Sequence, residues 1–237
     1  MKQIPLALGS DHSRRFDDFV AGDNVLAVTH LRGLGAAAAP VFLWGPPGSG
    51  KSHLLEAMVN RQAGQGARCG VFRPCDPTPW THDARWSLIG LEDCDRYDAS
   101  QQQAAFALFI EAADAATPII ASAQWPPIDL TLREDLRTRL GWGHVFELKP
   151  LAEREVRAAL SREADRRSLQ LADEVTDYLL THCPRDLKHL CVLIQRLDDY
   201  SMSLKRAVTV PLLRQMLARH VQSPSAGDSP QISEAVG

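Results

Sequence analysis

The residues Gly45-Pro46-Pro47-Gly48-Ser49-Gly50-Lys51-Ser52 match the pattern G-x-x-x-x-G-K-[ST] at every fixed position. They follow an apolar run of β-forming residues, 41–44, and open a helical pattern that runs to about Ala63. In such a loop the glycines turn backbone N–H groups toward a β-phosphate, Lys51 adds a point charge, and Ser52 offers a hydroxyl to Mg²⁺. An accidental Gly/Pro turn would not need both flanking elements. The stretch therefore predicts a phosphate-binding loop for ADP or ATP with Mg²⁺.

Strand and helix patterns alternate on both sides of this loop. After the strand 41–44, further strands are expected at 69–72, 86–91, 118–121 and 145–148. Helices are expected from Asn24, as the capping residue, to about Leu34, and then at 51–63, 101–115 and 132–140. Strands that alternate with helices predict an α/β fold, here a parallel five-stranded sheet flanked by helices.

The pattern changes after Pro150. Three or four helices are expected there, at 152–167, 172–181, 184–200 and 210–220, and they predict a small all-α domain. The last stretch is rich in Ser, Pro and Gly and is expected to be disordered. The predicted organisation is an N-terminal peptide 1–9, a nucleotide-binding domain 10–150, a helical domain 151–221 and a tail 222–237.

Glu92 and Asp93 directly follow the predicted strand 86–91. A phosphate-binding loop needs an acidic residue at the tip of a nearby strand, which holds the water shell of the metal and polarises the attacking water. We therefore expect Glu92 on the metal side with Ser52, and Asp93 at the water-activating position. Aspartate is the usual metal-side residue, and the extra methylene of Glu92 moves its carboxylate by about 1.5 Å. The chain's own ATPase activity is thus expected to be weak or absent. Alternatively, the two acids only begin a solvated loop.

Two arginines of the predicted helix 132–140, Arg137 and Arg139, come shortly before the last strand. An arginine there can point out of the subunit toward the γ-phosphate of a neighbour, where an arginine finger raises the rate by about 10³–10⁵. Arg185, at the start of a helix in the second domain, can reach phosphates from that side. The alternatives are an exposed surface arginine for the first two, and a helix-start residue paired with Asp186 or Glu174 for Arg185.

Composition narrows the classes of function. The 26 basic and 29 acidic residues give a net charge of −3, which argues against a polycationic nucleic-acid binder. The five cysteines include no C-x-x-C pair and no zinc-site spacing, so reduced thiols are expected. No run approaches the roughly 18 apolar residues that a membrane span needs, and no signal peptide is recognisable. These features predict a soluble cytoplasmic protein without a membrane partner.

The loop, the acidic strand end, the Arg-x-Arg sequence before Gly141-Trp142-Gly143 and Arg185 together resemble the AAA+ ATPases, and among them the DnaA-like family. Phe16-Asp17-Asp18-Phe19-Val20 resembles the opening motif of that family, which precedes its base-binding segment. The resemblance runs from about Phe16 to His220. It implies the AAA+ P-loop fold with a helical lid.

The resemblance also implies roles for single residues. Arg139 matches the arginine finger of the family, and Arg185 matches its sensor-2 arginine. At the sensor-1 position the relatives carry an acidic or amide side chain, which leaves Ser122 or Gln124 for this role here. Within the family the chain resembles the Hda branch, the regulatory inactivators of DnaA. No basic helix-turn-helix domain follows His220, so no sequence-specific DNA binding of its own is expected.

The N-terminal peptide Gln3-Ile4-Pro5-Leu6-Ala7-Leu8 resembles the hexapeptide by which such proteins bind the replicative sliding clamp, the β subunit of DNA polymerase III. In this mode of recognition Gln3 anchors an extended peptide by hydrogen bonds, while Leu6 and Leu8 enter an apolar pocket. The alternative is an unremarkable tail, because short peptides of this kind also occur by chance.

The function implied by the resemblance is negative regulation of replication initiation. The chain would dock on the DNA-loaded clamp through residues 3–8, contact ATP-bound DnaA and present Arg139, leaving inactive ADP-bound DnaA near the nucleoid and replisome. Two alternatives remain: a DnaA-like initiator or helicase-loader ATPase, and a clamp adaptor whose nucleotide site is vestigial. Whether the chain forms a homo-oligomer stays open.

Overall fold

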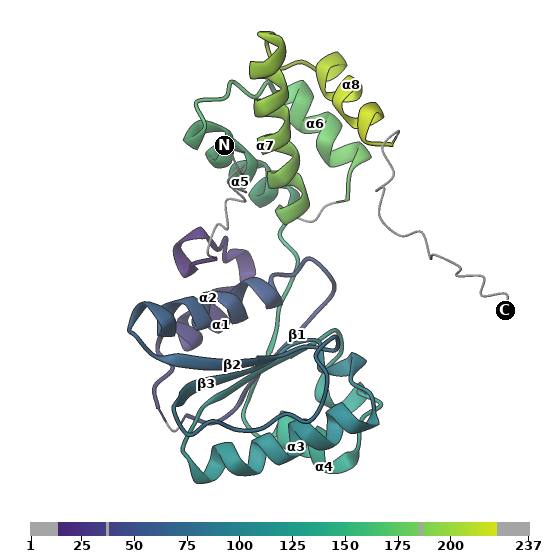
Figure 1. The fold of residues 1–237 in the computed structure, drawn as a ribbon. Helices are drawn as coiled ribbons and strands as arrows, with labels where there is room; N and C mark the ends of the chain where they lie inside the picture. The colour runs from purple at the N-terminus through teal and green to yellow at the C-terminus, as the bar shows by residue number, and fades with distance from the viewer. Residues whose placement is uncertain (1–13, 37, 185–186, 222–237) are drawn as a thin grey trace, which may run out of the picture. The chain divides into compact units, whose positions relative to one another are not determined.

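The computed structural model describes residues 14–36, 38–184 and 187–221. The chain divides into two compact units, Met1–Glu155 and Val156–Gly237. Figure 1 shows the first unit as a sheet between two layers of helices and the second as a group of helices only.

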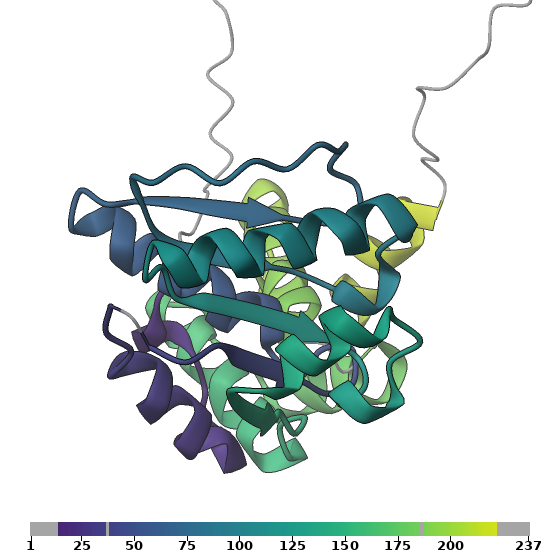
Figure 2. The same ribbon diagram turned by 90° about the horizontal axis from the view of Figure 1, so that it is seen from below.

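In the described part of the first unit, five strands form one sheet: β1 (Val41–Trp44), β2 (Arg68–Phe72), β3 (Trp86–Leu91), β4 (Ile119–Ala123) and β5 (His144–Glu147). Their order across the sheet is β2-β3-β4-β1-β5, and every neighbouring pair is parallel. The strand arrows in Figure 2 accordingly point the same way. The predicted parallel five-stranded sheet is therefore confirmed, and the loop after β1 leaves from the interior of its carboxyl edge.

Helices connect these strands and make up the second unit. The α-helices of the described residues are α1 (Val25–Arg32), α2 (Lys51–Gly64), α3 (Ala99–Asp114), α4 (Glu134–Gly141), α5 (Glu153–Arg166), α6 (Asp173–His182), α7 (Leu187–Leu204) and α8 (Val210–Val221). Short 3-10 helices lie at Phe16–Asp18, Gly22–Asn24, Cys94–Arg96 and Pro127–Asp129. Pro150, where the sequence predicts a domain boundary, lies in the connection between β5 and α5.

One expected helix cap is wrong. The side chain of Asn24 makes no capping hydrogen bond to α1, and α1 ends at Arg32 rather than near Leu34. Instead, Nδ2 of Asn24 donates to the carbonyl oxygen of Lys149 at 2.9 Å, and the Lys149 N–H donates to Oδ1 at 2.8 Å. Asn24 is only 4% exposed, and a buried amide is most stable when both of its ends are paired. The pair ties the start of α1 to the segment after β5.

The two faces of the sheet carry separate apolar clusters. On one face α1 and α2 pack over Val41, Leu43 and Ile120; on the other, α3 and α4 pack over Phe42 and Ile119 (Figure 1). Successive residues of a strand point to opposite faces, so the apolar run of β1 serves both clusters. A parallel strand that is buried on both faces has a continuously apolar sequence. Such runs allowed β1 and β3 to be predicted from the sequence.

The second unit is built from helices with one apolar side each. The side chains of Leu160, Leu179, Ile194 and Leu213, from α5, α6, α7 and α8 in turn, are at most 1% exposed. Helices that are apolar on one side stabilise one another by burying that side. The helical domain expected after Pro150 is thus a four-helix arrangement in the described residues. None of the helices in the described ranges is both long and apolar enough to cross a membrane.

Candidate functional site

The predicted phosphate loop joins β1 to α2 at the carboxyl edge of the sheet. Gly45, Gly48 and Gly50 all have positive φ angles, of 151°, 80° and 98°. A Cβ atom on Gly45 would lie 2.3 Å from the carbonyl oxygen of Leu148, and one on Gly50 would lie 2.6 Å from Cε2 of Phe19. Glycine is therefore required at both positions for conformation and for space.

The residues of this loop fit a phosphate group. Oγ of Ser49 is buried and has no hydrogen-bond partner in the described structure, a state that is costly unless a ligand supplies an acceptor. Gly50 precedes the first residue of α2, so the unpaired N–H groups of the helix begin at the loop. Ser52, the second residue of α2, is half-buried beside them. The N–H groups, the hydroxyl and the helix dipole all favour an anion here.

Lys51 lies inside the loop and is 8% exposed. Its ammonium group donates to the carbonyl oxygens of Gly45 at 2.7 Å and Pro46 at 3.1 Å. Burial lowers the pKa of Lys51, while the charges of Asp93 and Asp95 oppose this shift. The fold therefore brings the lysine and the acidic strand end together, as a site for a metal-bound phosphate requires.

Glu92 is paired within the fold. It follows β3, it is 7% exposed, and its Oε2 accepts a hydrogen bond of 2.7 Å from Nε of Arg73. Arg73 follows β2, the neighbouring strand. The predicted metal-side carboxylate thus already has a cationic partner, which the sequence did not predict.

Asp93 is held in an unusual backbone conformation. Its φ angle is 51°, and its N–H donates to Oγ of Ser122 at 3.1 Å. Burial, together with the charges of Glu92 and Asp95, raises the pKa of Asp93. A carboxyl group with a raised pKa near a phosphate site is a candidate for handling the proton of an attacking water.

The two candidates for the sensor-1 role differ in their contacts. Ser122 is fully buried in β4, and its hydroxyl accepts from Asp93. The backbone N–H of Gln124, just after β4, donates to Oδ1 of Asp95 at 3.3 Å. Because β4 lies between β3 and β1, both residues lie between the acidic strand end and the loop.

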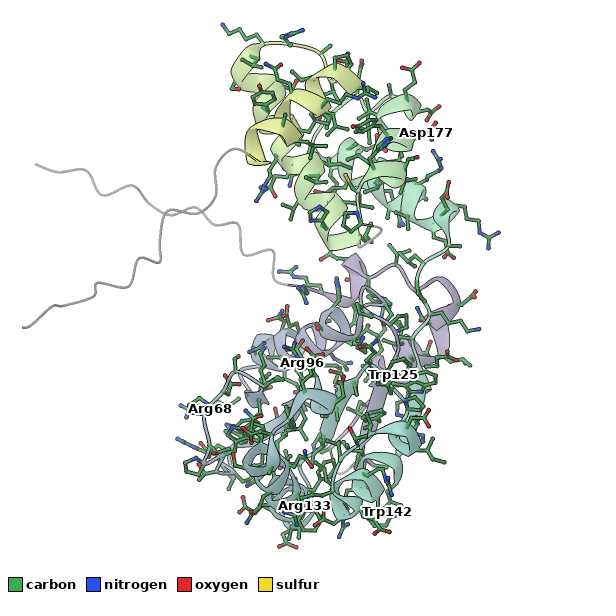
Figure 3. The ribbon with its side chains drawn as sticks, turned by 90° about the vertical axis from the view of Figure 1, so that its right-hand side faces the viewer. Arg68, Arg96, Trp125, Arg133, Trp142 and Asp177 are labelled. Carbon is green, nitrogen blue, oxygen red and sulfur yellow. The ribbon has the colours of Figure 1, made fainter. Side chains whose placement is uncertain are left out.

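Arg139 lies in the last turn of α4, with its guanidinium 5.2 Å from the ring centre of Trp142. Trp142 is 72% exposed, and Figure 3 shows it with Arg133 at the surface of the layer formed by α3 and α4. Arg133 is paired with Asp135 at 2.7 Å, whereas Arg139 forms no ion pair with any described carboxylate. Arg139 also lines an open groove of about 720 Å³, with Phe106, Arg133, Glu134, Asp135 and Thr138.

The end of α4 and the phosphate loop lie at opposite edges of the sheet. The N–H of His144 donates to the carbonyl oxygen of Pro40, just before β1, at 2.8 Å, and His144 is in register with Val41. The loop begins only after Trp44, so the four residues of β1, about 13 Å at 3.3 Å per residue, separate the two edges. The last turn of α4, which carries Arg139, therefore lies at the edge opposite the phosphate loop of its own chain.

Two sets of predicted site residues lie outside the described residues. These are Arg185 and the proposed clamp-binding peptide 3–8, and their roles stay predictions. Conversely, Arg73 and Phe19 take part in the site without having been assigned a role there. Arg73 follows β2 as Glu92 follows β3, so a known strand order would have predicted the pair.

Comparison with known proteins agrees with this architecture. Residues 153–217, which span α5 to α8, match the family of the Hda lid domain. An uncharacterized protein of Haemophilus influenzae is 28% identical over 228 residues, covering 91% of this chain and 98% of that protein.

Solved structures show the same fold at low sequence identity. Domain III of the Thermotoga maritima replication initiation protein DnaA has a TM-score of 0.71 at 18% identity, over 89% of this chain and 98% of that one. AMPPCP-bound DnaA from Aquifex aeolicus gives 0.68 at 20%, over 89% and 70%. The RuvB motor of Thermotoga maritima gives 0.61 at 15%, over 87% and 72%. The predicted AAA+ fold is confirmed, and the segment from α5 to α8 resembles the lid domain of Hda.

Proposed function

We propose that the chain binds an adenine nucleotide and restrains replication initiation by stimulating the hydrolysis of ATP bound to DnaA. The similarity of its lid to that of Hda and of its fold to that of DnaA supports a DnaA-related regulator. The product, ADP-bound DnaA, is the inactive form of the initiator in this proposal.

The position of Arg139 carries the proposal. Its guanidinium has no described carboxylate partner, it stacks on an exposed tryptophan, and it lies at the sheet edge opposite its own phosphate loop. An arginine in this state suits a γ-phosphate that belongs to another subunit. There it would stabilise the charge of the transition state while water attacks and ADP leaves.

The chain's own nucleotide has a different role in this proposal. The glycines of the loop, Ser49, Lys51 and Ser52 would hold the phosphates of ADP or ATP, and Mg²⁺ would neutralise their charge. Because Glu92 is paired with Arg73, we expect slow turnover at this site. The bound nucleotide would then serve mainly to stabilise the fold in a state that binds DnaA.

Docking on the sliding clamp completes the proposal. The peptide 3–8 would bind the clamp as an extended segment, with Gln3 as its polar anchor. A clamp that encircles DNA would raise the local concentration of the chain where replication has begun, so inactivation of DnaA would follow initiation.

The test measures phosphate release from ATP-bound DnaA in the presence of clamp loaded on DNA. We expect the chain to stimulate release strongly, and Arg139→Ala and Gln3→Ala each to abolish the stimulation. Arg137→Ala is the matched control, because Arg137 is on the same helix and likewise forms no ion pair in the described structure. Stimulation that persists with Arg139→Ala, or without the clamp, would contradict the mechanism.

A further inference from the structure

The ion pair between Arg73 and Glu92 is built into the register of the sheet. Phe72, the last residue of β2, is paired with Leu91, the last residue of β3. The next residues on the two strands are Arg73 and Glu92, and the N–H of Glu92 continues the ladder by donating to the carbonyl oxygen of Phe72 at 2.9 Å. Backbone pairing therefore sets the two side chains opposite each other.

Further contacts hold this pair in place. The N–H of Arg73 donates to Oδ2 of Asp76 at 2.7 Å, which fixes the turn after β2. Nε of Arg73 donates to Oε2 of Glu92 at 2.7 Å, and the side chains are 42% and 9% exposed, respectively. A short charge-assisted hydrogen bond to a largely buried carboxylate is strong, because water does not replace it readily.

We propose that Arg73 is a positioning residue that holds Glu92 away from the metal of a bound nucleotide, so that the chain retains nucleotide instead of hydrolysing it. This inference rests on the nucleotide binding proposed above. Magnesium demands nearly ideal octahedral geometry, and a carboxylate that is already hydrogen-bonded to a guanidinium is poorly placed to join its water shell.

The inference predicts how Mg²⁺ affects the binding of ADP to the full chain without DnaA or clamp. In the parent protein the dissociation constant of fluorescently labelled ADP should change little when Mg²⁺ is added. Arg73→Ala frees Glu92, so Mg²⁺ should then strengthen binding by about tenfold more than in the parent. Adding Glu92→Gln to Arg73→Ala should remove this gain, because the amide carries no charge for the metal.

Matched variants separate positioning from stability. Arg85→Ala breaks the exposed ion pair with Asp83 before β3, away from the site, and should leave the Mg²⁺ dependence unchanged. Arg73→Lys keeps the charge and should stay close to the parent. Glu92→Gln alone tests the pair from the other side. If Glu92 does not serve the metal in the parent, this variant should also leave the Mg²⁺ dependence unchanged.

The outcomes distinguish this inference from the proposed function. If Arg73→Ala binds ADP with the Mg²⁺ dependence of the parent and only its melting temperature falls, the pair is structural and the inference is wrong. If Glu92→Gln alone weakens Mg²⁺-dependent binding, Glu92 already serves the metal and the inference is also wrong. If the parent binds neither ADP nor ATP, the proposed nucleotide site itself fails, together with what rests on it.

Discussion

The carboxyl edge of the sheet and the end of α4 both carry cationic side chains, but these side chains have different kinds of partner. At the carboxyl edge, Lys51 donates to two loop carbonyls and Arg73 pairs with Glu92. At the end of α4, Arg139 has no described acidic partner and stacks on Trp142, which is 72% exposed. The cations at the carboxyl edge are paired with oxygen atoms of the fold, whereas Arg139 contacts an exposed aromatic ring.

The proposed function accounts for this difference. A cation held by neighbours in its own fold is preorganised, and it suits a nucleotide that stays bound to the chain. An arginine beside an exposed tryptophan is typical of residues that dominate protein–protein binding energy, since Trp and Arg are enriched at such positions. In the proposed function, the loop accordingly binds the chain's own nucleotide, and Arg139 contacts the nucleotide of a partner.

Arg139→Ala should have the largest effect of the variants considered, and it should change hydrolysis without changing ADP binding. An arginine finger contributes about 10³–10⁵ to the rate, so stimulation of DnaA-bound ATP hydrolysis should fall by at least about 10³. The affinity of the chain for ADP should stay that of the parent, because the loop is at the other edge. Single-turnover phosphate release and ADP titration, on one preparation, measure the two effects. A loss of ADP binding would mean that the two edges are coupled.

Lys51→Ala should affect the opposite edge. Hydrogen bonds to charged groups contribute about 1.5–3 kcal/mol, so the dissociation constant for ADP should rise by about 10–10². Equilibrium titration with labelled ADP checks this. Lys149→Ala is the control, because Lys149 is an exposed lysine next to the same edge whose structural contacts are made by its backbone. An unchanged affinity would remove Lys51 from the phosphate site.

Much of the fold could be predicted from the sequence because its strands are buried on both faces. Val41–Trp44 and Trp86–Leu91 form at the predicted residues, since an apolar run ends at Gly45 in one case and at Glu92 in the other. Helix ends were less well predicted. Asn24 pairs with the backbone of Lys149 instead of capping α1, and this partner is 125 residues away in the sequence.

The site shows the same limit. The loop depends on residues close together in the chain, so a local pattern indicates it. The pairing of Arg73 with Glu92 depends on β2 lying next to β3, and alternation of strands and helices does not determine strand order. The phosphate-binding type of loop was therefore predictable, whereas the cation that pairs with Glu92 was not.

Gly143→Ala should test whether the end of α4 is built as tightly as the loop. A Cβ atom there would lie 1.9 Å from the carbonyl oxygen of Pro40, so β1 or the turn must move. We expect a loss of about 1–3 kcal/mol in the free energy of unfolding, measured by urea denaturation. Gly64→Ala, in α2, meets nothing within 4 Å and should be neutral or stabilising, because alanine favours helix. Equal stabilities would contradict the close approach.

Asp93→Asn should have the smallest effect on stability. The dependence of this effect on pH shows whether it comes from the charge of Asp93. Burial and the neighbouring carboxylates raise the pKa of Asp93 above its ordinary value of 3.8, so the folded state disfavours the charged form. In the nucleotide-free chain, the variant should therefore melt slightly above the parent at neutral pH, by less than the shift for Gly143→Ala.

The sign follows from proton linkage. A carboxyl group whose pKa is raised by folding binds more protons in the folded state, so the stability it contributes falls as the pH rises from its unfolded pKa through its folded pKa. The difference in melting temperature between Asp93→Asn and the parent should thus be smallest below the unfolded pKa of 3.8 and larger at about pH 8. Asp129→Asn, an exposed carboxylate near α4, should show no such trend. A constant difference would mean that the charge of Asp93 is compensated at the carboxyl edge as fully as that of Glu92. In the nucleotide-free chain, folding would then not disfavour the charged form of Asp93 at the phosphate site.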